Sequence, residues 1–190
     1  MKIIGHRIFG KSIQEENGRF GDVYNPATGD VESKVALASD SDVDKAVAAA
    51  KKALPEWSDT PPIQRARVLF KYKQLIEDNI DELANLVGRE HGKTLTDAKG
   101  SVIRGLEVVE FACGIPHLLK GEYTEQVGTG VDSFSMRQPV GIAAGITPFN
   151  FPAMVPLWMY PIAIACGNTF ILKPSERDPS CPIRLAELLD

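Results

Sequence analysis

Two short apolar runs on either side of a longer apolar stretch constrain the fold of this 190-residue chain most strongly. Residues 140–146 carry no charge and predict a strand buried on both faces, as in a parallel sheet. Residues 153–166 are too few to cross a membrane and predict a buried helix, which Pro152 can begin and Gly167-Asn168 can end. Residues 169–172 predict a second buried strand. The order of these segments predicts a βαβ unit.

Polar side chains follow both predicted strands. Residues 147–150 come after the first strand and residues 173–176 after the second. Ligands of open α/β sheets bind outside the carboxyl ends of the strands, so both clusters are candidate site residues. The Asn150 amide can donate a hydrogen bond to a developing oxyanion, and Lys173 with Glu176 can bind the hydroxyls of a ribose. Either cluster alone is more simply a turn or a solvated loop, but their order at consecutive strand ends favours a site.

These motifs resemble the aldehyde dehydrogenase superfamily. The resemblance rests on Pro148-Phe149-Asn150-Phe151-Pro152, on Gly167-Asn168-Thr169 and on Lys173-Pro174-Ser175-Glu176. It extends over essentially the whole chain, from Tyr24 onward. Phe149, where the superfamily has tryptophan, and the segments 154–159 and 167–177 are most similar to the CoA-acylating methylmalonate-semialdehyde dehydrogenase branch. Family subunits are well over twice this length, so the resemblance is to an amino-terminal portion only.

The resemblance implies an α/β fold: the amino-terminal part of an aldehyde dehydrogenase-like fold, with helices and the start of a Rossmann-like parallel sheet. Residues 1–121 would form the strands and helices of the cofactor-binding domain. Residues 122–139, which alternate and contain several glycines, would form a small β excursion for oligomerisation. Residues 140–190 would form the first βαβ unit of the NAD-binding sheet. The catalytic domain would follow Asp190.

The same resemblance implies NAD-dependent oxidation of methylmalonate or malonate semialdehyde to propanoyl-CoA or acetyl-CoA through a cysteine thioester. Coenzyme A would be the co-substrate and Asn150 a catalytic residue. The implied NAD-binding residues are Thr147, Phe149, Lys173, Glu176 and Arg177. A carboxylate such as Glu176 near the 2′-hydroxyl favours NAD over NADP, because it would repel a 2′-phosphate. The chain has no G-x-G-x-x-G pattern, which agrees with the superfamily's atypical docking of the cofactor.

None of the three cysteines is a good nucleophile candidate. Cys113 and Cys166 occupy apolar helical positions, where cysteine is usually a small buried hydrophobe. Cys181 lies near a helix start, which can lower a thiol pKa, but it has no neighbouring histidine and no family motif. We therefore expect this chain alone to be inactive. Two alternatives stay open: a catalytically inactive fragment or nucleotide-binding domain, and a water-using aldehyde dehydrogenase.

The rest of the sequence predicts a scaffold of small strands and three helices. One or two strands are expected within residues 3–24, a turn at 25–29, a strand at 31–37, a helix capped by residues 39–42, a second helix from 61 to 87 and a third from 95 to 115. On the third helix, one apolar stripe is formed by Ala98, Val102, Leu106, Val109 and Cys113.

Arg104 lies on a second predicted stripe of the third helix, with Val108, Phe111 and Ile115. A helix apolar on two sides is expected to be substantially buried, and a buried guanidinium requires an anion. The anion is either Glu107, three residues on, or a substrate carboxylate held bidentately, and the sequence leaves both open. Gly100 and Gly105 remove side-chain bulk beside Arg104 and could admit a ligand or another backbone.

Composition excludes some function classes. The formal charge of −4 gives no basic footprint, so nucleic acid is not an expected partner. No apolar run is long enough to predict a membrane span, and three cysteines without paired spacing favour a reducing compartment, with cytoplasm as the default. His6, His91 and His117 lack ligand spacing, so no metal site is predicted and solvated or core roles are favoured. By resemblance, the full-length protein would be a homodimer or homotetramer.

Overall fold

The computed structural model describes residues 1–14 and 18–190 and has the predicted α/β class. Its strands are β1 (Lys2–Ile4), β2 (His6–Ile8), β3 (Lys11–Ile13), β4 (Arg19–Tyr24), β5 (Val31–Leu37), β6 (Tyr123–Gly128), β7 (Val131–Phe134), β8 (Ile142–Ile146) and β9 (Thr169–Lys173). Its helices are α1 (Asp40–Asp59), α2 (Pro62–Asp78), α3 (Ile80–His91), α4 (Leu95–Cys113), α5 (Ile115–Leu118), α6 (Met154–Ala165) and α7 (Ser180–Leu189).

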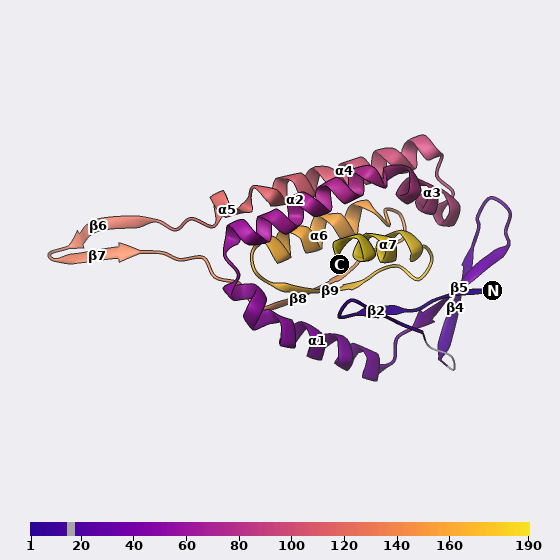
Figure 1. Cartoon of the computed structure of the whole chain (residues 1–190), viewed down its shortest axis with the longest axis horizontal. Coiled ribbons are helices and arrows are strands. Elements are labelled where there is room, and N and C mark those ends of the chain that lie inside the picture. Colours follow the sequence, from indigo (N-terminus) through magenta and orange to yellow (C-terminus); the bar gives the residue numbers. More distant parts are fainter. Residues whose placement is uncertain (15–17) are drawn as a thin grey trace.

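The predicted βαβ unit forms the centre of the molecule. Strands β8 and β9 pair in parallel, from Ile142 opposite Thr169 to Ile146 opposite Lys173, and α6 connects them. Figure 1 shows α6 on one side of this pair and α1 on the other. The turn after α6 forms as predicted: Gly167 adopts φ of +90°, and Asn168 donates its side-chain amide to the carbonyl of Ala163.

The main core lies among α2, α3, α4, α6 and α7. The first predicted stripe of α4 is confirmed, because all five of its residues are buried. Helices α4 and α6 approach closely at Gly105, where a Cβ would lie 2.6 Å from the Cδ1 of Leu157. Gly105 therefore admits another helix rather than a ligand. At Gly100 a Cβ would meet nothing within 4 Å, so that position faces open space.

The helix boundaries differ from the prediction at one place. Helices α2 and α3 replace the single helix expected over residues 61–87. Asn79 separates them, with its side chain donating to the Leu75 carbonyl at 2.7 Å. Apolar periodicity continues across the break because both helices pack on the same core. The capped start of α1 is as predicted: Ser39 and Asp42 form a capping box, and the hydrogen bonds from Ser39 lower the pKa of Asp42.

Strand β8 is more exposed than its sequence predicts. We expected a strand buried on both faces, but Ile146 is 79% exposed and Val140, just before the strand, is 92% exposed. Within the described residues β9 is the strand that pairs with β8, so the other edge of β8 is open. An apolar parallel strand normally has neighbours on both edges, which explains the composition of β8.

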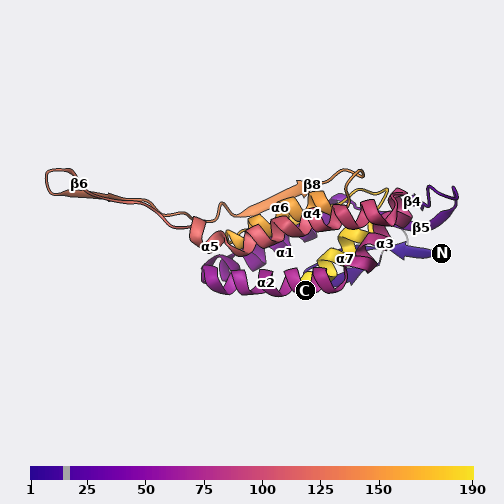
Figure 2. The same ribbon diagram turned by 90° about the horizontal axis from the view of Figure 1, so that it is seen from above.

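Strands β6 and β7 form an arm that extends away from the body (Figures 1 and 2). They pair antiparallel, with Tyr123 opposite Phe134, and every residue in both strands is exposed. The predicted exposed two-stranded excursion is confirmed. Because an isolated two-stranded ribbon is marginally stable, an arm of this kind gains stability from a surface to pack on.

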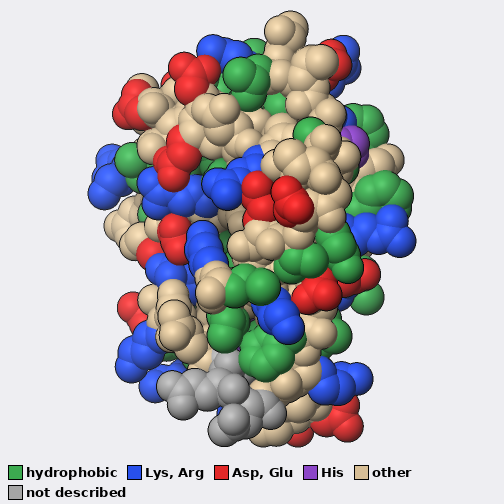
Figure 3. Space-filling view, turned by 90° about the vertical axis from the view of Figure 1, so that its right-hand side faces the viewer, with side chains coloured by type: hydrophobic (Ala, Val, Ile, Leu, Met, Phe, Trp, Pro, Cys, Tyr) green, Lys and Arg blue, Asp and Glu red, His purple; other side chains and the backbone are tan. Residues whose placement is uncertain are grey.

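The N-terminal strands form a separate small layer. Strands β1, β5 and β4 make a three-stranded sheet and β2 pairs with β3, so residues 3–24 contain more strands than we expected. The strand at residues 31–37 is confirmed as β5. Figure 3 views this end of the molecule, where basic and acidic side chains are interspersed. The described part of this face therefore presents no extended area of one charge.

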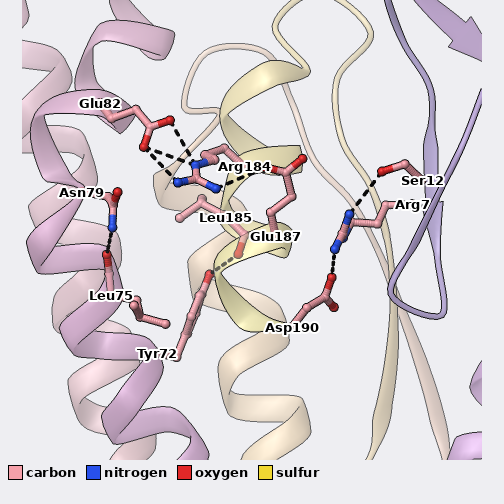
Figure 4. Close-up of polar contacts among 10 residues, drawn as sticks. All are labelled: Arg7, Ser12, Tyr72, Leu75, Asn79, Glu82, Arg184, Leu185, Glu187 and Asp190. Carbon is pink, nitrogen blue, oxygen red and sulfur yellow. Dashed lines mark hydrogen bonds and ion pairs between the residues drawn. The ribbon is translucent and has the colours of Figure 1, made fainter.

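Helix α7 is held by polar contacts to distant elements (Figure 4). Arg184 donates to the carboxylate of Glu82 on α3 and to Glu187 one turn along. Arg7 on β2 pairs with Asp190, and the Tyr72 hydroxyl donates to the Leu185 carbonyl at 3.1 Å. These contacts fix the segment that follows β9.

Two carboxyl groups lie near the start of α7: Glu90 of α3, which is partly buried, and Asp178, which is buried. The Ser180 amide donates to Glu90 at 2.9 Å, and burial raises the pKa of Glu90 against the effect of that bond. Asp178 is 2% exposed, and its Oδ1 accepts no hydrogen bond from any residue that the structure describes. Burial raises the pKa of Asp178 to about 7, with Glu90 adding to the shift and Ser175 and Lys93 opposing it. These acids are therefore a pH-sensitive feature of the fold.

We expect Gly105→Ala to destabilise the protein by about 1–3 kcal/mol, because the added methyl group overpacks the α4–α6 contact. Gly100→Ala is the matched control on the same helix. It should stabilise the protein by up to about 1 kcal/mol, because alanine favours the helix and meets no neighbour. Urea denaturation of both variants measures the difference. Equal effects would contradict the proposed close packing.

We expect Asp178→Asn to remove a pH dependence of stability. Between about pH 4 and pH 7 folded Asp178 retains a proton that the unfolded chain releases, so its contribution to stability is lost as pH rises through about 7. The melting temperature of Asp178→Asn should equal that of the wild type near pH 4 and exceed it increasingly up to pH 8. Asp44→Asn, which changes an exposed carboxylate to an amide, is the control, and the same trend in that variant would contradict the assignment to Asp178.

Candidate functional site

The two polar clusters predicted from the sequence lie at the same edge of the β8–β9 pair. The parallel register places Ile146 opposite Lys173, and the Thr147 amide donates to the Lys173 carbonyl at 3.1 Å. The segment after β8 and the segment after β9 therefore leave the sheet side by side. This is the edge at which ligands of parallel α/β sheets bind.

The candidate cofactor residues after β9 contact one another and Phe149. The Lys173 ammonium lies 2.8 Å from the Glu176 carboxylate, and this hydrogen bond lowers the pKa of Glu176. Both side chains are about half exposed, so the pair contributes at most about 1 kcal/mol to stability. The Arg177 guanidinium lies 4.7 Å from the centre of the Phe149 ring. These groups are available for a ligand rather than required for folding.

Thr147 has a different environment from the other predicted cofactor residues. It is 4% exposed, and its hydroxyl has no hydrogen-bond partner among the residues that the structure describes. Such an orphaned polar group at a strand end suits a ligand. A lysine, a carboxylate and a threonine hydroxyl at one sheet edge supply the donors and acceptors that a nucleotide ribose and phosphates need, so they fit NAD.

Asn150 lies in the turn between β8 and α6, and its side chain is exposed. Its amide group makes no hydrogen bond within residues 1–14 and 18–190. Its backbone carbonyl accepts a hydrogen bond from Lys93 Nζ at 2.9 Å. The backbone of this turn is thus held, while its amide is free to bind a ligand.

Lys93 was missed by the sequence reasoning. It lies 57 residues from Asn150, and no motif connects the two residues. Only the tertiary packing of the α3–α4 connection reveals this contact. The expectation that His91 is solvated or satisfied in the core is not met at its Nδ1, which is buried without a hydrogen-bond partner among the described residues.

A pocket of about 600 Å³ lies beside this turn, between the start of α4 and the start of α6. Its walls are formed by Lys93, Thr96, Asp97, Gly100, Ser101, Arg104, Phe151, Met154 and Trp158. It combines three large apolar side chains with two cations and the carboxylate of Asp97, so positive charge exceeds negative charge by one. The buried Ser101 hydroxyl has no partner in the described chain. Such a mixture suits a small organic anion.

Arg104 is a site residue for a reason other than the predicted one. The prediction of a second buried stripe holds only in part: Ile115 is buried and Val108 partly buried, but Phe111 is 55% exposed and Arg104 is itself exposed. The packing of α2, α3 and α6 buries one face of α4 and leaves the other in solvent. Arg104 therefore does not require an anion for folding. Among the described residues it forms no ion pair with Glu107, and it lines the pocket.

The rejection of the three cysteines as nucleophiles agrees with their surroundings. Burial raises the pKa of the Cys113 and Cys166 thiols. The helix start does not lower the pKa of the Cys181 thiol. Cys181 is 1% exposed, and its burial raises the pKa, with the carboxyl groups of Glu90 and Asp178 adding to the rise. A thiol with a raised pKa is a poor nucleophile at neutral pH.

Within residues 1–14 and 18–190, no group of three or more His, Cys, Asp or Glu side chains lies close enough together to hold a metal ion. No helix in the described part of the chain is both long and apolar enough to cross a membrane.

Residues 13–190 match the aldehyde dehydrogenase family. The chain is 56% identical over 183 residues to a malonate-semialdehyde dehydrogenase of Pseudomonas aeruginosa, covering 96% of this chain and 37% of the relative. It is 53% identical over 181 residues to an Arabidopsis thaliana protein named methylmalonate-semialdehyde dehydrogenase [acylating], mitochondrial, covering 95% of this chain and 30% of that protein.

Solved structures give the same result. A Sinorhizobium meliloti protein described as a methylmalonate-semialdehyde dehydrogenase, complexed with NAD, has a TM-score of 0.97 and 61% identity over all of this chain and 38% of its own. Methylmalonate-semialdehyde dehydrogenase of Oceanimonas doudoroffii has a TM-score of 0.97 and 54% identity, with the same coverage. The chain thus spans well under half the length of these relatives. It belongs to the aldehyde dehydrogenase family.

Proposed function

We propose that this chain is part of an NAD-dependent, CoA-acylating dehydrogenase of methylmalonate or malonate semialdehyde. The observation that carries the proposal is the pocket in which Arg104 faces Phe151, Met154 and Trp158, next to the turn of Asn150. An aldehyde that also bears a carboxylate fits such a pocket, because Arg104 can bind the carboxylate and the apolar walls the short carbon chain. The names of the relatives support the same substrate class.

Asn150 is the proposed oxyanion donor. Attack of a thiolate on the aldehyde carbon places a negative charge on the aldehyde oxygen, and the free Asn150 amide can donate a hydrogen bond to it. The attacking cysteine is not Cys113, Cys166 or Cys181, whose thiols are disfavoured by burial. The activity therefore requires residues outside this chain, and we expect residues 1–190 alone to be inactive.

NAD is the proposed cofactor, and it supplies the acceptor for the hydride that leaves the aldehyde carbon. Thr147, Lys173 and Glu176 would bind its adenosine half, with Phe149 and Arg177 at the border of the site. The presence of NAD in the Sinorhizobium meliloti relative supports this assignment. The carboxylate of Glu176 favours NAD over NADP, as the sequence predicts.

Coenzyme A is the proposed acyl acceptor. The acylating activity in the name of the Arabidopsis relative supports transfer to coenzyme A over transfer to water. Formation of acetyl-CoA or propanoyl-CoA also requires the substrate carboxyl group to leave as carbon dioxide.

The β6–β7 arm, exposed along its whole length, is the proposed contact between subunits of a homo-oligomer.

The direct test is turnover by the full-length protein with malonate semialdehyde, NAD and coenzyme A. We expect NADH and a CoA thioester in equal amounts. Formation of free acid at the same rate without coenzyme A would favour a water-using enzyme instead.

We expect Lys173→Ala to weaken NAD binding by roughly 10- to 100-fold, because removal of a charge-assisted hydrogen bond costs about 1.5–3 kcal/mol. Stability should change little, because the partner of Lys173 among the described residues is the exposed Glu176. Calorimetric titration of the full-length protein with NAD measures the dissociation constant. Lys34→Ala, which removes an exposed lysine near Asp22, is the control. An unchanged NAD affinity would refute the assignment of Lys173.

We expect Arg104→Leu to raise KM for malonate semialdehyde by roughly 10- to 100-fold and to leave KM for propanal unchanged, because only the first aldehyde carries a carboxylate. Steady-state kinetics on both aldehydes measure the effect. Arg67→Leu, which removes an exposed arginine outside the pocket, is the control. A wild-type ratio of kcat/KM for the two aldehydes would show that Arg104 does not select the substrate.

A further inference from the structure

The turn that carries Asn150 has few contacts of its own that restrain its position. Helix α6, which follows it, begins without a side-chain cap, and Asn150 itself is exposed. An oxyanion donor must be held within a fraction of an ångström of its working position to be effective. Something outside the turn must therefore restrain it.

Lys93 makes two contacts with this turn. Its ammonium donates a hydrogen bond to the Asn150 carbonyl at 2.9 Å. The same ammonium lies 4.0 Å from the centre of the Phe151 ring, a distance at which a cation and an aromatic face attract each other. One charged group thus contacts the backbone of Asn150 and the side chain of the next residue.

Lys93 is itself placed by rigid elements. It lies between the last residue of α3 and the N-cap of α4, Thr94, whose hydroxyl accepts from the Asp97 amide at 3.2 Å. Gly92 ends α3 in the left-handed conformation, with φ of +84°. A Cβ there would lie 2.8 Å from Pro26, so only glycine fits this reversal well.

Acidic side chains lie near Lys93. Burial lowers the pKa of Lys93, whereas the carboxyl groups of Asp178 and Asp97 oppose that shift. The hydrogen bond to the Asn150 carbonyl and the contact with the Phe151 ring both come from this one ammonium group.

We propose that Lys93 is a positioning residue that holds the Asn150 turn against the α3–α4 connection and so directs the Asn150 amide toward the substrate oxygen. This inference rests on the proposed function, because it assigns Lys93 to the oxyanion donor of that reaction. Lys93 also lines the pocket, so direct binding of the substrate carboxylate is the competing role.

The test is a kinetic comparison in the full-length protein. Lys93→Met should lower kcat by roughly 10- to 100-fold for both malonate semialdehyde and propanal, with little change in KM for either. Lys93→Arg should retain most of the activity, because arginine can still donate to the carbonyl. Lys99 of α4 pairs with Asp81 of α3, and Lys99→Met is the control that should match the wild type. An effect of Lys93→Met confined to KM for malonate semialdehyde would show direct carboxylate binding and overturn the proposal.

A double-mutant cycle separates this inference from the proposed function. If Lys93 acts through Asn150, adding Lys93→Met to Asn150→Ala should lower kcat no further. Multiplicative losses would overturn the positioning role while leaving Asn150 as oxyanion donor. A wild-type kcat for Asn150→Ala would instead refute the proposed role of Asn150. In that case a crystal structure of Lys93→Met still tests the restraint itself, since an undisplaced Asn150 turn would contradict it.

Discussion

The parallel register of β8 against β9 places the candidate cofactor residues and the turn of Asn150 at neighbouring strand ends. Because Ile146 lies opposite Lys173, the turn of Asn150 and the loop of Glu176 leave the sheet next to each other. Helices α1 and α6 cover the two sides of this pair. A shift of the register by one residue would turn each side chain to the other face and separate the two clusters.

Close helix packing extends the site away from the sheet. Gly105 lets α4 approach α6 at Leu157, and this approach places the first turns of both helices around one pocket. Arg104 is the neighbour of Gly105, so the residue next to this close helix contact is exposed and lines the pocket. The close packing of α4 on α6 and the position of the Arg104 guanidinium both follow from the way these two helices cross.

The acidic side chains near the start of α7 belong to the scaffold of the protein rather than to the candidate site. Glu90 fixes the start of α7 through Ser180, and Asp178 lies buried nearby with its pKa raised to about 7. The charge of Lys93 partly opposes the rise in the pKa of Asp178, and the Lys93 ammonium also contacts the Asn150 turn.

Sequence alone determined the local elements of this protein. The βαβ unit, the capping box at Ser39 and the strand at residues 31–37 follow from short-range periodicity, capping and turn chemistry, which are encoded within a few residues. The tertiary structure alone decided which faces are buried and which distant residues meet. Phe111 is exposed, β8 has an open edge and Lys93 contacts Asn150 across 57 residues because neighbouring elements, not sequence spacing, determine the surroundings of each side chain.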